Sequence, residues 1–204
     1  MTQERWQALM SSLGVTDTSP TYDALVGAYS EKHRHYHTIR HVDDCLEKLD
    51  VAKDFAKEPA KIEVALWFHD AVYDPYKSGN EEKSAEWAYE FLTASGVAID
   101  VASRVRSHIL ATKHEAVAED ADSRLLVDID LSILGAEEAE YDAFEKNVRE
   151  EYKWVPGFVF NKKRAEILQS FLDRPQLYSA EYFRSRYEAK ARENLRGAIA
   201  RLTG

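Results

Sequence analysis

The feature that most constrains this chain is its shortage of turn-forming residues. It has 8 glycines and 5 prolines in 204 residues, about half the usual share of these two residue types. Few turns leave long elements between them, and the spacing of apolar residues predicts that these elements are helices. Apolar residues occupy positions 62, 64, 65, 66 and 68, which is too dense for strand alternation and typical of a buried helix. Positions 101, 105 and 109 repeat every four residues, as one face of a helix requires.

Start and stop signals support the same interpretation. Pro20 and Pro59 each stand where a first helical turn loses no hydrogen bond. Further signals are an N-cap at Asn80, a stop at Gly96, a cap at Asp100, an end at 173–175 and a start at Ser179. The sequence contains no convincing strand, internal repeat or low-complexity linker. We therefore expect an all-α chain of eight to ten helices in one domain.

Size and charge narrow the classes of function. A chain of 204 residues buries enough surface to fold without a disulfide or a metal, so a bound metal would serve chemistry. The net charge of −9 argues against general nucleic-acid binding, which depends on Lys and Arg neutralising phosphates. It allows a small anionic substrate, because a few cations in one pocket suffice. We expect such a cationic pocket within an acidic surface.

The cellular location is predicted from cysteine content and hydropathy. Cys45 is the single cysteine and cannot form an internal disulfide, which favours a reducing compartment. Residues 1–13 do not form the apolar core of a signal peptide. No apolar run approaches the roughly 18 residues that span a bilayer. We therefore expect a cytoplasmic protein with no membrane partner.

Histidine distinguishes this chain from an ordinary helical bundle, since the stretch 33–41 reads H-R-H-Y-H-T-I-R-H. His37 and His41 are four residues apart, so on one helix both would project from the same face. Zinc proteases use this spacing in H-E-x-x-H, where the glutamate activates water. Thr38 stands at that position here, so the protease interpretation fails. We expect His33 and His35 to be surface residues.

Acidic residues inside apolar segments accompany these histidines. His69 and Asp70 end one apolar segment, and the sequence D-I-D at 128–130 lies within another. Burying a charged carboxylate costs several kcal/mol unless it is paired or bound to a metal. Two imidazoles and two carboxylates suit a divalent cation that keeps open positions for water and substrate. Such a cation generates hydroxide near neutral pH and can bind a phosphoryl oxygen.

The pattern His41, His69-Asp70 and Asp130 resembles the H…HD…D signature of the HD superfamily of metal-dependent phosphohydrolases. Flanking segments make the chain similar to a small bacterial group of predicted HD-superfamily phosphohydrolases. These segments are YHTIRHV at 36–42, FHDAVYDP at 68–75, NEEKSA at 80–85, ATKH at 111–114, VDIDLSILG at 127–135, REEY at 149–152 and ARENL at 191–195. The resemblance implies an HD-type helical bundle, with a metal-site core at about 30–135 and C-terminal helices over 137–204 packed on it.

The resemblance also implies roles for individual residues. The segment Y-H-T-I-R-H is similar to the Y-H-N-x-x-H segment of cyclic nucleotide phosphodiesterases, in which the first histidine protonates the leaving oxygen. His37 would therefore be the general acid. Asp74 stands near the position at which many HD proteins have an acidic residue that helps to position water. A divalent ion (Mn²⁺, Mg²⁺, Fe or Zn²⁺) would be held by His41, His69, Asp70 and Asp130.

Two choices among the metal ligands stay open. Asp128 suits a cap of the helix expected to start there, and Asp130 suits a ligand, but the two roles could be exchanged. Dinuclear HD enzymes add two histidines between the HD pair and the last aspartate. His114 fits that pattern and His108 fits it less well, so we expect one tight metal and a weaker second. Glu81 and Glu82 precede them in the chain.

The expected activity is hydrolysis of a nucleotide or another small phosphoester. Arg149 would bind substrate, or would instead pair with Glu145 one turn earlier. The alternatives to a phosphohydrolase are an HD-fold di-iron oxygenase and a non-catalytic nucleotide-binding sensor. The aromatic C-terminal third is expected to be core, with a homodimer interface as the second interpretation. The candidates for binding the substrate phosphate are Arg40, Lys113, His114 and Arg149, with Arg164 as a further cation.

Overall fold

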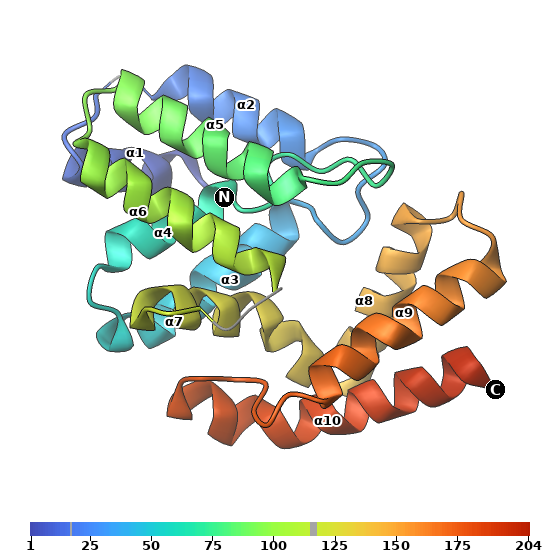
Figure 1. Ribbon diagram of the computed structural model, residues 1–204. Helices are drawn as coiled ribbons and strands as arrows, with labels where there is room; N and C mark the ends of the chain where they lie inside the picture. The colour runs from blue at the N-terminus through green and yellow to red at the C-terminus, as the bar shows by residue number, and fades with distance from the viewer. Residues whose placement is uncertain (17, 115–117) are drawn as a thin grey trace. The chain divides into compact units, whose positions relative to one another are not determined.

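The computed structural model describes residues 1–16, 18–114 and 118–204 (Figure 1). Within these residues the regular structure consists of ten α-helices and short 3-10 turns, with no strand, which confirms the all-α expectation. The chain divides into two compact units, Met1–Val127 and Asp128–Gly204. The boundary falls inside one helix, a few residues before position 135, where the metal-site core was expected to end. The expectation of a single domain stays a prediction.

The N-terminal unit is built around a helix whose second half is buried on all sides. This helix, α4, packs against α1, α3, α5 and α6, and its last residues Trp67 and Phe68 are fully buried. The Trp6 ring of α1 lies 5.1 Å from the Trp67 ring. The end of α4 is therefore one of the best-fixed points of this unit. Its helices are α1 (Gln3–Ser12), α2 (Ser19–Tyr29), α3 (Ile39–Ala52), α4 (Pro59–Phe68), α5 (Asn80–Ala94), α6 (Ile99–Leu110) and most of α7 (Ala121–Asp130), with 3-10 turns η1 (Lys53–Phe55) and η2 (Ala111–Lys113).

The helix boundaries follow the sequence signals where those signals are local. Helices α2 and α4 begin at Ser19 and Pro59, and α5 ends just before Gly96, whose φ of 82° lies in the left-handed region. The predicted cap at Asp100 is wrong, because α6 is preceded by Ala98 and Asp100 lies in its first turn. Acidic residues suit that turn as well as the cap, since both lie at the positive end of the helix dipole.

The predicted N-cap at Asn80 is also wrong, and a contact with a preceding turn explains why. Asn80 is the first residue of α5, after Gly79. Its amide oxygen accepts a hydrogen bond from the backbone N–H of Asp74 at 3.2 Å, and its amide nitrogen donates to the Asp74 carbonyl at 3.1 Å. The side chain is thereby used to hold the turn before the helix and does not cap the helix itself.

The start of α4 is held from another helix of the same unit. Asp122, in the first turn of α7, is buried and accepts hydrogen bonds from the backbone N–H groups of Lys57 and Glu58, both at 2.9 Å. The carboxylate therefore performs the function of a helix cap across 64 and 65 residues of sequence.

The C-terminal unit consists of α8 (Glu138–Glu151), α9 (Gly157–Leu172) and α10 (Glu181–Thr203), with the 3-10 turn η3 (Leu131–Gly135). Helix α10 packs along both α9 and η3. Asn194 of α10 donates hydrogen bonds to the carbonyls of Leu134 and Ala136, each at 2.9 Å. These bonds fix η3 against the middle of the long last helix.

Most aromatic residues of this unit lie in its core, as expected. Exceptions are Trp154 and Phe158, which are 48% and 80% exposed. The alternative of a dimer interface stays a prediction. The buried aromatic residues are Tyr141, Phe144, Phe160, Phe171, Tyr178 and Phe183.

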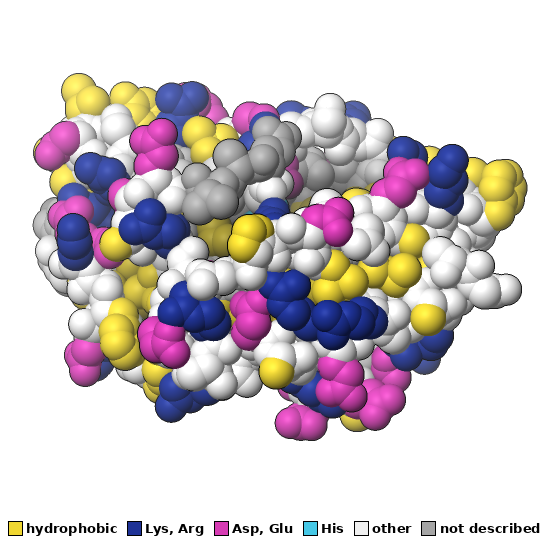
Figure 2. All heavy atoms as spheres, turned by 60° about the horizontal axis from the view of Figure 1, so that its bottom comes forward, with side chains coloured by type: hydrophobic (Ala, Val, Ile, Leu, Met, Phe, Trp, Pro, Cys, Tyr) yellow, Lys and Arg dark blue, Asp and Glu magenta, His cyan; other side chains and the backbone are white. Residues whose placement is uncertain are grey.

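Charged side chains of both signs are interspersed on the face shown in Figure 2. Lys and Arg side chains lie among Asp and Glu side chains there, with hydrophobic side chains between them. The net charge of −9 is therefore not expressed as one acidic field on this face. Among the helices that the structure describes, none has the length and apolar character needed to cross a membrane.

Candidate metal centre

The N-terminal unit brings together three of the predicted ligands, His41, His69 and Asp70. His41 is in the first turn of α3, and His69 and Asp70 directly follow α4. The Nε2 atoms of the two histidines lie 3.0 Å apart. The Oδ2 atom of Asp70 lies 3.0 Å from Nε2 of His69 and 3.5 Å from Nε2 of His41. Three ligand atoms, one from α3 and two from the residues that directly follow α4, therefore face one another.

The hydrogen bond at Nδ1 of the His69 ring indicates that this cluster needs a cation. Nδ1 of His69 lies 2.9 Å from the carbonyl of Leu66, and a carbonyl can only accept, so Nδ1 carries a proton. In neutral His69 the Nε2 atom then presents a lone pair to the Asp70 carboxylate, which is also an acceptor. A cation between them, either a proton or a metal ion, removes this conflict. Metal-binding histidines typically use the other ring nitrogen in this way.

The electrostatics of Asp70 favour its charged form. Burial opposes ionisation of this carboxyl, but the positive charge of His69, followed by that of His37, and the hydrogen bond to His69 hold its pKa below the usual range. An ionised carboxylate beside two imidazole nitrogens is a donor set that suits divalent first-row metals.

Cys45 joins the histidines and was not foreseen as a ligand. It lies one turn after His41 on α3, is buried, and its Sγ is 3.9 Å from both ring nitrogens of His41. His41, Cys45 and His69 belong to a group of side chains that could hold a metal ion, and the ligand role of Asp130 stays a prediction. Asp130 is the partly buried last residue of α7, the helix in which the boundary between the units falls. The spacing of four residues between His41 and Cys45 was the available sequence signal.

Asp128 has a structural role in the C-terminal unit, but not the predicted one. It lies near the end of α7, so it does not cap a helix that starts there. Its two oxygens accept hydrogen bonds from the backbone N–H groups of Ser179 at 2.9 Å and Ala180 at 2.6 Å, just before α10. Burial raises the pKa of Asp128 to about 6 against the opposing effect of these hydrogen bonds. Both oxygens are thus engaged with backbone.

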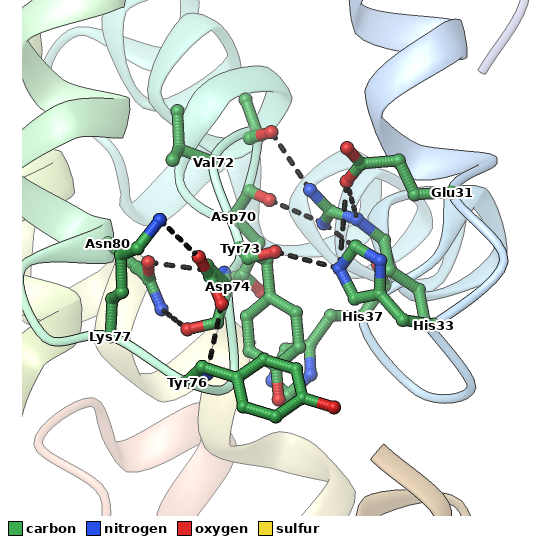
Figure 3. A network of polar contacts seen from close by, with 12 residues as sticks. Glu31, His33, His37, Asp70, Val72, Tyr73, Asp74, Tyr76, Lys77 and Asn80 are labelled. Carbon is green, nitrogen blue, oxygen red and sulfur yellow. Dashed lines mark hydrogen bonds and ion pairs between the residues drawn. The ribbon is translucent and has the colours of Figure 1, made fainter.

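His37 lies beside the cluster, but it is not on the helix that carries His41. Helix α3 begins at Ile39, after Thr38 in an extended conformation, so the expectation of one helix for both histidines is wrong. The His37 ring stacks on Tyr73 with centroids 4.2 Å apart and lies 6.1 Å from the His41 ring. The loop therefore achieves the proximity that the helical spacing had suggested, and Figure 3 shows His37, Tyr73 and Asp70 close together.

Asp74 lies in the turn that follows the His-Asp pair, where its carboxylate is engaged locally (Figure 3). It accepts a hydrogen bond from the backbone N–H of Tyr76 at 3.0 Å and pairs with Lys77 at 2.9 Å. The hydrogen bond from Lys77 is the main cause that lowers its pKa. Its role in positioning water stays a prediction.

The predicted phosphate-binding cations have different surroundings. Arg40 is exposed on α3 next to His41, and Lys113 forms an ion pair with Glu82 at 2.8 Å. His114 follows η2 with a φ of 57°, in the left-handed region. Their role in substrate binding stays a prediction, and Arg40 is the one adjacent in sequence to a ligand of the cluster.

The two candidate arginines of the C-terminal unit, Arg149 and Arg164, are both engaged within that unit. Arg149 donates to the carbonyls of Tyr152 at 2.6 Å and Val155 at 3.0 Å, which satisfies the end of α8. Glu145, the alternative partner foreseen for Arg149, instead accepts two hydrogen bonds from Arg164 at 2.7 and 3.0 Å. Substrate binding by Arg149 stays a prediction, as does the role of Arg164.

His108, considered for a second metal, is buried in a separate polar network. Its Nδ1 lies 2.7 Å from Oγ of Ser123, which in turn donates to Asp120 at 2.6 Å. Burial lowers the pKa of His108, partly offset by Asp120 and Asp122. A neutral His108 thus donates from Nδ1 to Ser123, while its buried Nε2 atom has no hydrogen-bond partner among the described residues. Glu81 and Glu82 lie in the first turn of α5.

Comparison of this chain with protein-family models, with curated proteins and with solved structures found no match in any of the three.

Proposed function

We propose that this chain is a metal-dependent phosphohydrolase that resembles the HD superfamily. Its substrate would be a nucleotide or another small phosphoester. The observation that carries the proposal is the convergence of His41 Nε2, His69 Nε2 and Asp70 Oδ2 within 3.5 Å, with the His69 tautomer fixed by the Leu66 carbonyl. This cluster supports the motif-based assignment, because His41 and His69 meet in it although 28 positions separate them in the sequence.

The donor set fits a divalent ion. His41, His69 and Asp70 would hold the ion, with Asp130 as the fourth ligand and Cys45 beside them. A thiol next to imidazole and carboxylate favours Zn²⁺ or Fe over Mg²⁺, which prefers oxygen ligands. When bound, such an ion activates water near neutral pH and polarises a phosphoryl oxygen.

The residues around the cluster would supply the remaining chemistry. His37 would hold the proton that the leaving oxygen needs, and its stacking on Tyr73 supports a fixed ring orientation. Arg40, exposed beside His41, would neutralise the substrate phosphate, with Lys113, His114 and Arg149 as further candidates.

The test replaces the His-Asp pair and measures metal and activity separately. His69→Ala and Asp70→Ala are purified beside the wild-type protein, and their metal content is determined by mass spectrometry. Hydrolysis is then assayed on a panel of nucleotides and phosphoesters with Mn²⁺, Mg²⁺, Fe²⁺ or Zn²⁺ supplied in turn. We expect wild type to bind one ion tightly and hydrolyse at least one substrate, and both variants to lose metal and activity.

A matched control is His35→Ala, which removes an exposed histidine from the same part of the chain. It should keep the metal content and rate of wild type. Metal and hydrolysis that both persist in His69→Ala and Asp70→Ala would refute the assignment. Two irons per chain with oxygen consumption would indicate the oxygenase, and a nucleotide that stabilises the protein without turnover would indicate the sensor.

A further inference from the structure

A buried arginine links the two segments that carry the proposed metal ligands and proton donor. The side chain of Arg34 has no exposed surface. It lies in the loop between α2 and α3, three residues before His37. An arginine enters the interior of a protein only when its N–H groups are satisfied, because an uncompensated buried charge is strongly destabilising.

The guanidinium of Arg34 donates to three backbone carbonyls from two parts of the chain. One Nη1 bond reaches the carbonyl of His37 at 3.1 Å, and another reaches that of Asp70 at 2.7 Å. Nη2 donates to the carbonyl of Ala71 at 2.9 Å. The planar guanidinium thus joins the loop of His37 to the turn of Asp70. Asp70 lies 36 residues after Arg34 in the sequence.

Three further contacts orient the same guanidinium group. Nε of Arg34 donates to the Glu31 carboxylate at 3.0 Å. The guanidinium carbon also lies 5.2 Å from the Tyr29 ring centroid and 5.5 Å from that of Tyr73. Tyr73 in turn stacks on His37. Arg34 therefore acts on His37 both through its backbone and through the ring against it.

We propose that Arg34 is a positioning residue, whose guanidinium fixes the His37 loop against the Asp70 turn and so sets the distance between proton donor and metal. This inference rests on the proposed function. It assigns no contact with substrate, because the N–H groups of Arg34 point to protein carbonyls and to Glu31. A lysine at this position would keep the charge but lose the planar fork that reaches three carbonyls at once.

The test compares Arg34→Lys with Arg192→Lys, which offers a matched control in the C-terminal unit. Arg192 also donates to three backbone carbonyls, those of Leu172, Arg174 and Pro175, and to one carboxylate, that of Glu188. Both substitutions remove the same kinds of contact, but Arg34→Lys should cost more stability, because the Arg34 side chain has no exposed surface and that of Arg192 is 21% exposed. Only Arg34→Lys should alter the metal centre.

Two readouts separate positioning from a merely structural role. The first is the dissociation constant for Mn²⁺ or Zn²⁺ by titration calorimetry without substrate. It should rise by about 10–100-fold in Arg34→Lys, as expected when the partner of a ligand is removed. The second is the ratio of kcat for an alkyl phosphomonoester to kcat for the aryl ester p-nitrophenyl phosphate. The alkyl ester needs a proton donor, so its kcat should fall more than that of the aryl ester.

The two possible failures are distinguishable. A wild-type protein that binds no divalent ion overturns the proposed function and this inference together. If wild type binds metal but hydrolyses nothing, the phosphohydrolase function is refuted. The dissociation constant for the metal ion then decides the role of Arg34 by itself. A metal constant and an alkyl-to-aryl ratio that change no more in Arg34→Lys than in Arg192→Lys overturn the positioning role. Should Arg34→Lys not fold, Glu31→Ala removes the acceptor of the Arg34 Nε hydrogen bond and must show the same trends to a smaller degree.

Discussion

The contact between η3 and α10 predicts how two glycine-to-alanine substitutions will change the free energy of unfolding. Gly135 is buried at the end of η3. A Cβ added there would lie 2.6 Å from both Cβ and the carbonyl oxygen of Tyr187 on α10, and 2.9 Å from its Cα. These distances are far inside the 3.4 Å at which ordinary contact begins. Three atoms at or next to the Tyr187 backbone would be hit, so no side-chain rotation relieves the clash.

Gly135→Ala should therefore force η3 and α10 apart. Overpacking of a well-packed core costs about 1–3 kcal/mol, and we expect the upper end here because α10 is also tied to η3 by Asn194. Gly197→Ala is the matched control on α10, since its Cβ would lie 3.6 Å from the end of the Arg201 side chain. That variant should gain about 0.4–1 kcal/mol, because alanine restricts the unfolded chain and favours the helix.

The assay is urea unfolding followed by far-ultraviolet circular dichroism. The two variants should differ by about 3–4 kcal/mol in free energy of unfolding, with opposite signs relative to wild type. Hydrogen exchange should place the loss of protection in Gly135→Ala within residues 128–204, where the perturbed contact lies. A Gly135→Ala protein that is as stable as Gly197→Ala would refute the close approach of η3 to α10.

Three further predictions concern the N-terminal unit. A divalent ion at a hundred times its dissociation constant should raise the free energy of unfolding of wild type by about 2.7 kcal/mol, and calorimetric scans of His41→Ala should show no such gain. Asp122→Ala should cost about 2 kcal/mol in urea unfolding, because the backbone N–H groups at the start of α4 lose their acceptor, whereas Asp100→Ala in the first turn of α6 should change stability by about 0.5 kcal/mol or less. Burial lowers the folded-state pKa of His108 below the usual 6.5, so the unfolded chain binds more protons and stability should fall as the pH drops below that value. The slope of unfolding free energy against pH should be smaller in His108→Phe, and an unchanged slope would contradict this cause.

The sequence predicted the helices well where the signals are local. Pro59 marked the start of α4 because proline fixes its own φ, and Gly96 marked the end of α5 because glycine readily adopts the positive φ that follows a helix. The caps expected at Asn80 and Asp100 were wrong because a side chain that suits a cap has other partners when the chain folds. Asn80 found such partners in the turn at Asp74.

For the metal ligands too, the sequence predicted what depends on neighbouring residues and failed where tertiary structure decides. His69 and Asp70 are adjacent in the sequence, so their proximity to each other needed no tertiary information. The expected face of a single helix for His37 and His41 was wrong, because α3 begins only at Ile39. Cys45 was overlooked as a ligand although it follows His41 by one turn, because a lone cysteine more often serves as a small apolar residue.

The amino-acid sequence by itself determined that this protein is helical and that it carries a His-Asp pair at the end of an apolar segment. Scarce glycine and proline, apolar periodicity and adjacency are local properties, so they can be read without knowledge of any long-range contact. The tertiary structure alone decided that His41 meets His69 at 3.0 Å and that Arg34 joins the carbonyls of His37 and Asp70. These contacts join segments about 28 to 36 residues apart, and they depend on how α3 packs against the buried helix α4. Spacing along the chain cannot encode that geometry, because it arises only when the two helices bury their apolar faces against each other.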